Sequence, residues 1–97
     1  MDRRLPCVYI LASRKRGTLY VGVTSDLITR IWQHKTRVTK CFTNQYHAHV
    51  FVWFELHGTM ESAVLREKAI KNWKREWKIR LVEDGNPQWV DLYPSLV

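Results

Sequence analysis

The chain has 97 residues, and its 45% hydrophobic and 12% aromatic content is typical of a folded domain and excludes a disordered tail. The formal charge of +7 favours a polyanionic partner such as nucleic acid, although an anionic membrane surface or an acidic protein would also be attracted. No apolar stretch is long enough for a signal peptide or a bilayer span, so we expect one cytoplasmic domain over residues 1–97 that does not enter a membrane. Cys7 and Cys41 match no metal-binding or disulfide spacing, and we expect both to be reduced.

Two strands joined by a tight turn are predicted at the start of the chain. Residues 7–12 (CVYILA) and 18–23 (TLYVGV) are dominated by β-branched and aromatic side chains. The link between them, residues 13–17, is short and polar and contains three cations and a glycine. These features predict a hairpin, with its turn centred on Arg14 and Lys15 if the two arms are equal.

Two tyrosines and a glycine are the candidate functional residues of this hairpin. With the turn centred as above, Tyr9 lies directly opposite Tyr20, and both rings share one face of the sheet. Tyrosine is common in strands for structural reasons, so neither residue points to a function by itself. Gly22 is less usual there, because glycine weakens a strand and often marks a close approach of another group to the backbone.

A helix is predicted from about residue 26 to residue 36 or 38, after the capping residues Thr24, Ser25 and Asp26. Its apolar stripe is formed by Leu27, Ile31 and Val38, joined by Ile28. Arg30 and His34 lie one turn apart at the margin of this stripe. Two interpretations are open. They are partly exposed residues bordering the sheet, or they are a guanidinium that binds a phosphate and an imidazole that moves a proton.

The second half of the chain contains one more strand and a long helical region. Residues 39–47 are polar and predict a loop, whereas the apolar run at residues 49–56 predicts a third strand buried on both faces. Residues 59–84 predict either two helices or one bent helix, capped by Thr59 or Ser62 and ended by Gly85 and Pro87. The tail is expected to pack back through Trp89, Leu92 and Tyr93. This order of elements predicts an α+β domain.

One carboxylate lies on an apolar helix face. On a helical wheel, Met60, Ala63, Val64 and Ile70 define this face, and Glu67 falls near its middle. A buried carboxylate is costly unless a cation or several donors satisfy it. Glu67 is therefore either a core residue that is paired or hydrogen-bonded internally, or a ligand for a hard divalent cation at the mouth of a cleft.

A cationic and aromatic segment, residues 71–80 (KNWKREWKIR), is a candidate nucleic-acid surface. It is either a solvated helix face whose tryptophans pack inward or a groove that binds phosphates and stacks bases, and stacking would favour a single strand. We predict the following substrate contacts over the whole chain: Arg14, Lys15, Gly22, Lys35, Lys40, Trp73, Lys74 and Asn86.

These residues together resemble the GIY-YIG nuclease superfamily. The first family motif corresponds to VYI at residues 8–10, with Tyr9, and the second to YVG at residues 20–22, with Tyr20. The patterns LYVGVTSDL, REKAIKNWKRE and NPQWVDL are similar to the small single-domain branch of the superfamily and cover nearly the whole chain. The remaining family positions correspond to Arg30, His34 and Glu67.

The resemblance implies a fold and a chemistry. The fold is a three-stranded antiparallel sheet flanked by helices, with the first strand in the middle, and we follow the resemblance on this order although the third strand is the more apolar. The chemistry is hydrolysis of a phosphodiester with one Mg²⁺ or Mn²⁺ ion on Glu67. Tyr20 is the implied general base, Tyr9 orients the water or binds the phosphate, and Arg30 neutralises the phosphate.

Two positions depart from the most familiar family pattern. The first motif lacks its glycine ahead of Tyr9, and Val23 stands where DNA-repair members have a lysine. Without that lysine we expect His34 to matter more for activating Tyr20. The late asparagine of the family is assigned to Asn86, with Asn72 as the alternative.

Three functions follow as hypotheses. The first is a metal-dependent endonuclease that cleaves DNA rather than RNA, with a preference for single-stranded or structured DNA, because no separate domain supplies duplex recognition. The second is a nucleic-acid-binding module without catalysis. The third is an interaction protein whose basic face binds an acidic partner.

Overall fold

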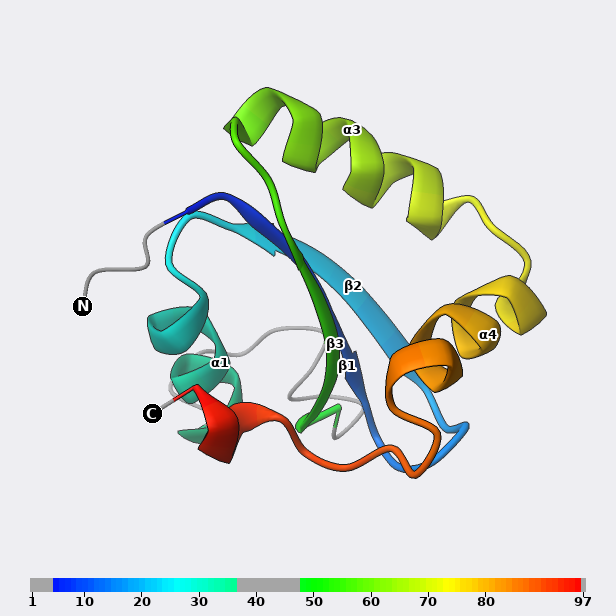
Figure 1. The fold of residues 1–97 in the computed structure, drawn as a ribbon. Helices are drawn as coiled ribbons and strands as arrows, with labels where there is room; N and C mark the ends of the chain where they lie inside the picture. The colour runs from blue at the N-terminus through cyan, green and yellow to red at the C-terminus, as the bar shows by residue number, and fades with distance from the viewer. Residues whose placement is uncertain (1–4, 37–47, 97) are drawn as a thin grey trace.

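The computed structural model describes residues 5–36 and 48–96 of the chain. Its elements, in chain order, are β1 (Cys7–Ala12), β2 (Leu19–Thr24), α1 (Leu27–Thr36), β3 (Val50–Leu56), α3 (Met60–Lys71), α4 (Arg75–Gly85) and the short 3₁₀ helix η1 (Tyr93–Ser95) (Figure 1). The predicted α+β class is confirmed. The expected loop at 39–47, together with Val38, Lys40 and Cys41, lies outside the described residues.

The three strands form one antiparallel sheet in the order β2-β1-β3. The strand order implied by the family resemblance is therefore confirmed, and the apolar third strand lies at an edge. All six residues of the central strand β1 are buried, whereas only two of the seven in β3 are. Its large aromatic side chains make β3 the most apolar strand in the sequence. Two of them, Trp53 and Phe54, are nevertheless only partly buried, because the strand lies at the edge.

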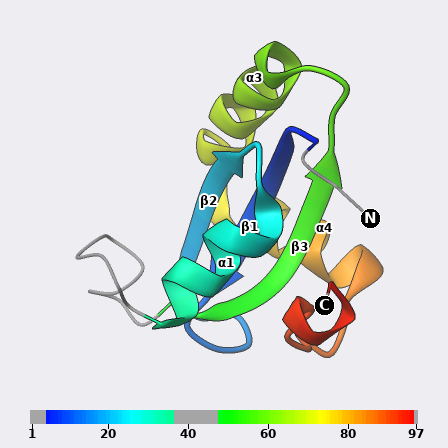
Figure 2. The same ribbon diagram turned by 90° about the vertical axis from the view of Figure 1, so that its left-hand side faces the viewer.

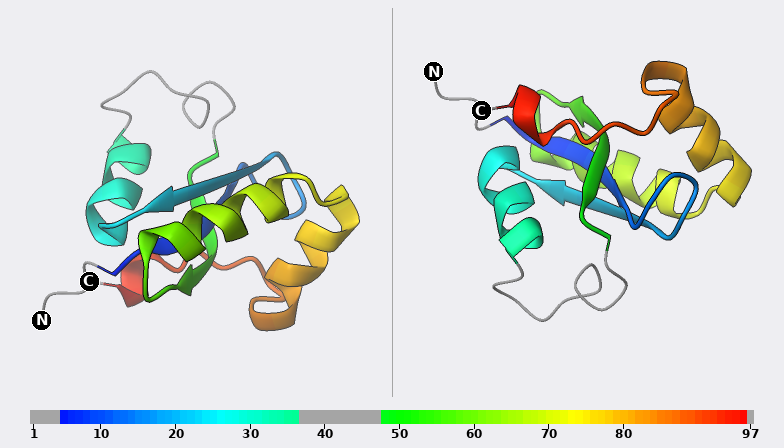
Figure 3. Two further views of the ribbon diagram at one scale, coloured as in Figure 1. Left: turned by 90° about the horizontal axis from the view of Figure 1, so that it is seen from above. Right: turned by 90° about the horizontal axis from the view of Figure 1, so that it is seen from below.

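Helices cover both faces of the sheet. α1 lies on one face, and α3 and α4 lie on the other (Figures 1 and 2). The alternation of β1 explains this arrangement, because Val8 and Ile10 join a core with residues of α3 and α4, whereas Tyr9 and Leu11 join a core with residues of α1. Seen from above and below, α3 runs along β2 and β1 (Figure 3), and these are the strands it contacts.

The hairpin register differs from the prediction. Tyr9 pairs with Gly22, and Tyr20 pairs with Leu11, so the two tyrosines are not directly opposite each other. The turn is centred one residue later than expected, because Arg16 adopts a left-handed conformation (φ 56°) and Gly17 N–H donates to the Arg14 carbonyl at 2.8 Å. The shift is an even number of residues along β2, so both rings still lie on one face.

The long helical region consists of two helices. Thr59 caps α3 by accepting a hydrogen bond from Ser62 N–H at 3.1 Å, and Asn72 ends that helix. Residues 72–74 then change direction before α4, which ends at Gly85 as expected. On α3 the wheel is correct for Ala63, Glu67 and Ile70, but Met60 in the first turn is exposed.

The tail packs back on the sheet, as predicted. Trp89 is buried with the α3–α4 core, and Leu92 and Tyr93 pack against the α1 core. Leu92 N–H donates to the Phe51 carbonyl at 2.7 Å, which attaches the tail to β3. Within the described residues, no helix has the length and apolar character needed to cross a membrane.

Candidate active site

Tyr9 lies against the backbone of β2 at Gly22. A Cβ atom at Gly22 would lie 2.4 Å from Cζ and 2.5 Å from the hydroxyl oxygen of Tyr9, so no other residue leaves room for the ring. The sequence signal of a glycine inside a strand therefore has a specific cause here. The central strand and its neighbour together hold the phenol in one orientation.

Three rings meet on the α1 face of the sheet. The Tyr9 hydroxyl lies 3.0 Å from Nε2 of His34, which the helix α1 directs toward the strand. Tyr20 lies next to both residues, with ring centroids 6.3 Å from Tyr9 and 5.6 Å from His34. His34 is only 6% exposed, so the expectation of a partly exposed border residue is wrong for this histidine.

Arg30 lies one turn before His34 on α1 and is exposed. Its positive charge lowers the pKa of Tyr9 and also that of His34. An exposed cation beside buried proton-transfer groups is well placed to receive a phosphate from solvent.

The environment sets the protonation of the two bonded groups. Burial raises the pKa of Tyr9 far above its usual value, the charge of an ionised Tyr20 raises it further, and Arg30 opposes both effects. Burial lowers the pKa of His34 to about 4, with additional contributions from Arg30 and His49. At neutral pH, Tyr9 therefore keeps its proton and His34 is neutral, so His34 has a ring nitrogen that can accept a proton.

Glu67 comes from the helix on the other face of the sheet. It is 8% exposed and lies between Ala63 and Ile70, which belong to the α3–α4 core. Its carboxylate forms an ion pair with Lys71, one turn later, at 2.5 Å. The structure thus brings Tyr9, Tyr20 and His34 together, with Arg30 one turn before His34 on α1. Glu67 is on α3, whose buried residues pack on the other face of the sheet.

The fit of a metal ion depends on this carboxylate. The described part of the chain has no group of three or more His, Cys, Asp or Glu side chains that could hold an ion. Mg²⁺ commonly uses one or two carboxylates, with water and substrate phosphates as its other ligands. Glu67 fits that kind of site if Lys71 leaves its carboxylate, and the remaining ligands must then come from water and substrate.

The predicted substrate contacts differ in their exposure and in their partners. Arg14, Lys15 and Lys74 are exposed and available. Lys35 instead pairs with Asp91 and donates to the His49 carbonyl at 2.9 Å. Lys40 lies outside the described residues.

Asn86 and Trp73 also have structural roles. The amide of Asn86 donates to the carbonyls of Val52 and Val90 and accepts from Val90 N–H, so all its hydrogen-bonding groups face the fold. Trp73 packs against the α3–α4 core and under the Arg66 guanidinium. Asn72, the alternative late asparagine, is exposed at the end of α3.

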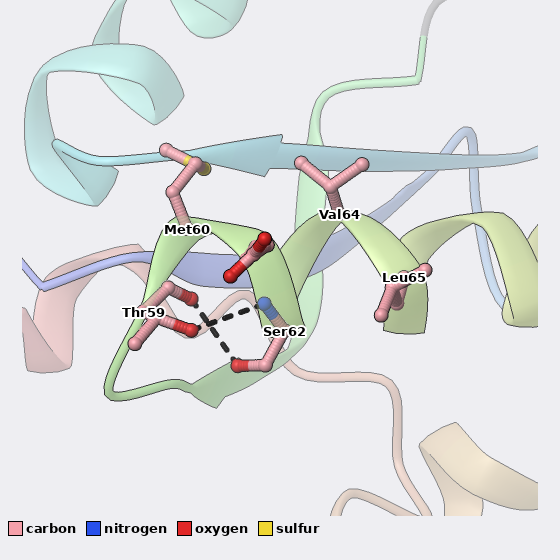
Figure 4. A pocket seen from close by; sticks show the side chains of 6 residues that line it. Thr59, Met60, Ser62, Val64 and Leu65 are labelled. Atoms are coloured by element: carbon pink, nitrogen blue, oxygen red, sulfur yellow. Dashed lines mark hydrogen bonds between the residues drawn. The ribbon is translucent and has the colours of Figure 1, made fainter.

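A hollow at the start of α3 is lined by residues of that helix and its cap and by none of the three rings (Figure 4). Met60, Val64 and Leu65 make its lining largely apolar, and the hydrogen bonds drawn there belong to the cap between Thr59 and Ser62. Among the described residues, Glu61 is the one charged residue that lines it, and the lining has no cation, phenol or imidazole.

Two residues near the cluster could not be identified as its neighbours from the sequence pattern. His49 Nδ1 lies 3.0 Å from the backbone carbonyl of His34, and its charge lowers the pKa of His34. Asp91 holds Lys35, the residue after His34. Both lie far from α1 in the chain, and neither belongs to a periodic pattern that would indicate its contact.

The GIY-YIG catalytic-domain family model matches residues 5–80. The chain belongs to the GIY-YIG family. This is a nuclease-type family whose substrate is nucleic acid, and the ring cluster with Arg30 contains the residues that correspond to its motifs.

Similar proteins agree with GIY-YIG membership. A UPF0213 protein of Staphylococcus saprophyticus is 31% identical over 80% of this chain and 94% of its own length. A UPF0213 protein of Haloquadratum walsbyi is 34% identical over 80% of this chain and 86% of its own length. A UPF0213 protein of Staphylococcus epidermidis is 28% identical over 88% of this chain and its full length. These names state no activity, and no solved structure matches the chain.

Proposed function

We propose that this GIY-YIG protein is an endonuclease that hydrolyses phosphodiester bonds in DNA, preferring single-stranded or structured substrates. The observation that carries the proposal is the Tyr9–His34 hydrogen bond, with Tyr20 in ring contact and the Arg30 charge beside them. A binding surface alone does not need a buried, neutral imidazole against a protonated phenol.

Hydrolysis requires a water oxygen to attack phosphorus, a proton to leave that water, and the bond to the leaving oxygen to break. Tyr20 takes the proton from the attacking water as its own hydroxyl proton passes to the Tyr9 oxygen. Tyr9 in turn passes its proton to Nε2 of His34, to which it is hydrogen-bonded, so both phenols end the step protonated. His34, whose pKa is about 4, returns the proton to solvent at neutral pH, and the leaving oxygen takes a proton from solvent.

Arg30 balances negative charge on the phosphate, and a bound divalent ion would add to this effect. Arg30 is exposed and lies one turn from His34, so it contacts the non-bridging oxygens as negative charge develops. A Mg²⁺ or Mn²⁺ ion held by Glu67 would supply further neutralisation of the phosphate. For that ion to bind, Lys71 must give up the ion pair that it now forms with Glu67.

A nucleic-acid-binding module without catalysis is the second candidate. The ion pair of Glu67 with Lys71 favours this alternative. A carboxylate satisfied within its own helix is the structural interpretation that the sequence left open.

A cleavage assay separates the two candidates. We would incubate end-labelled single-stranded, duplex and branched DNA with the protein and Mg²⁺, Mn²⁺ or a chelator, and then sequence the cut ends. The variants are Tyr20→Phe, His34→Gln, Arg30→Ala and Glu67→Gln, with Lys71→Met to release the carboxylate. Trp32→Ala is the control, because Trp32 is exposed on the same helix and makes no part of the cluster.

The nuclease proposal expects metal-dependent cleavage that falls about 100-fold or more in each site variant and persists in the control. Lys71→Met is expected to lower the metal concentration needed for half-maximal cleavage. Salt-sensitive binding without cleavage in any metal would establish the binding module instead.

A further inference from the structure

Trp77 is an exposed tryptophan on α4 beside a hollow of about 240 Å³. Trp77 is 49% exposed, although a large aromatic side chain on a small domain is normally buried. The hollow is lined by Trp73, Trp77, Arg80, Leu81 and Asp84. The last four of these recur at intervals of three or four residues, so they form one face of the helix.

The ring of Trp77 is held in a fixed orientation. Trp73 is anchored in the core and lies under the guanidinium of Arg66, 5.2 Å from the ring centroid. Trp77 packs edge-on against Trp73, with ring centroids 6.2 Å apart and an interplanar angle of 74°. The outward face of the Trp77 indole is therefore available for stacking without a large loss of side-chain entropy on binding.

The segment that carries this ring has an excess of positive charge. Residues 68–84 contain six cations against three acids: Lys68, Lys71, Lys74, Arg75, Lys78 and Arg80 against Glu76, Glu83 and Asp84. One of each is already paired, Lys71 with Glu67 and Glu83 with Arg16. Lys74 and Arg80 are exposed on either side of Trp77 in the sequence, where they can reach a phosphate backbone.

This surface is separate from the ring cluster of the candidate active site. α4 covers the sheet face opposite α1 (Figure 1), and Trp77 and Tyr9 belong to different layers of the fold. A strand bound at α4 is thus a second contact with nucleic acid, outside the site where bonds would be cut.

We infer that the Trp77 hollow binds an unpaired nucleobase of single-stranded DNA. The base stacks on the indole, Arg80 and Lys74 contact the flanking phosphates, and Asp84 accepts a hydrogen bond from an amino or imino group of the base. A paired base cannot enter, because its partner covers that edge. The inference rests on the proposed function only for the choice of ligand and does not require cleavage.

The test measures binding, with a chelator present so that nothing is cut. Fluorescence anisotropy would compare a labelled 12-nucleotide single strand of mixed sequence, its duplex, and an abasic strand with the same phosphates. The variants are Trp77→Ala and Trp77→Phe. Trp32→Ala is the matched control, because Trp32 is 50% exposed on α1, on the opposite face.

Loss of the binding free energy of one stacked base should make Trp77→Ala bind the single strand between about 5-fold and about 150-fold more weakly. Trp77→Phe should lose less, Trp32→Ala should change the affinity less than about twofold, and the abasic strand should bind wild type and Trp77→Ala equally. An unchanged affinity of Trp77→Ala for the single strand, or equal weakening by Trp32→Ala, would overturn the inference. Thermal melting checks that each variant is folded.

Failure of the nuclease proposal would look different. Wild-type protein that binds the single strand through Trp77 but never cuts it leaves this inference intact. Sedimentation could instead show a concentration-dependent mass that Trp77→Ala abolishes. If that variant also kept its single-strand affinity, the surface would belong to a contact with a second copy of the chain, and the inference would be wrong.

Discussion

At the scale of single residues, the candidate site depends on one missing side chain and one neutral ring. Gly22 leaves the space that the Tyr9 phenol occupies, and His34 accepts a position that is nearly closed to solvent. Adding a Cβ atom at Gly22 or a proton on His34 should lower the stability of the fold, because neither position has spare room.

The first prediction concerns Gly22→Ala. The added methyl would lie 2.4 Å from the Tyr9 ring, so the ring must move away, and we expect a loss of about 1–3 kcal/mol in the free energy of unfolding. Urea denaturation measures this loss. Gly58→Ala is the control, because a Cβ at Gly58 has no heavy atom within 4 Å, and its stability should be close to that of the wild type. Equal stability of the two variants would contradict the packing described for Tyr9.

The second prediction is a loss of stability in mild acid. The pKa of His34 is about 4 in the folded protein, against an ordinary value of 6.5, so the unfolded chain binds a proton first as the pH falls. Stability is therefore full above pH 6.5 and falls between pH 6.5 and 4, by about 3 kcal/mol if the whole shift is expressed.

Denaturation at several pH values tests the His34 prediction. His34→Gln cannot titrate, so its stability should vary less over that interval. Glu83 makes a separate contribution at lower pH, because its bonds to Arg16 and Trp89 lower the pKa of its carboxyl to about 2. An identical pH dependence of wild type and His34→Gln between pH 6.5 and 4 would show that the histidine is not buried as described.

At the scale of elements, α4 and the tail are joined by the amide of Asn86. The residue ends α4 and is 8% exposed, and its side chain bonds both to β3 and to the residue Val90 of the tail. These bonds explain how a segment with little regular structure covers the edge of the sheet at β3. They also show why an asparagine suits this position, since the side chain needs both a donor and an acceptor.

The third prediction compares the two asparagines. Asn86→Ala removes one buried and two partly buried hydrogen bonds and leaves the Val52 carbonyl without this donor, so we expect a loss of about 2–3 kcal/mol in the free energy of unfolding. Asn72→Ala removes one exposed bond to the Lys68 carbonyl and should change stability by less than about 0.5 kcal/mol. A similar small effect of both changes would argue that Asn86 has a role outside the fold.

At the scale of the whole molecule, the sheet separates two chemically different surfaces. The α1 face holds the two phenols and the imidazole, whereas the α4 face holds the Trp73–Trp77 pair in a segment with an excess of cations. A strand that contacts both must pass around an edge of the sheet. Such an arrangement uses a short chain to provide binding and chemistry at separate places.

The fourth prediction follows from this separation. Tyr9→Phe should lower kcat of DNA cleavage by about 100-fold or more and leave KM nearly unchanged, because it removes a group that acts on the reacting atoms. Trp77→Ala should raise KM for single-stranded DNA and leave kcat nearly unchanged. Steady-state cleavage of a fluorogenic single strand measures both constants. If both variants change the same constant, the two surfaces do not act separately.

The sequence by itself determined the local patterns. Alternation and β-branched residues indicated the strands, the 3.6-residue period placed Glu67 on the buried side of its helix, and Gly22 indicated a close approach. Tertiary structure alone decided the hairpin register, through the left-handed Arg16, and the burial of His34 against Tyr9. It also placed α3, which carries Glu67, on the sheet face opposite α1. The physical reason is that propensity and periodicity act between neighbours in the chain, whereas these contacts arise from the packing of segments distant in sequence.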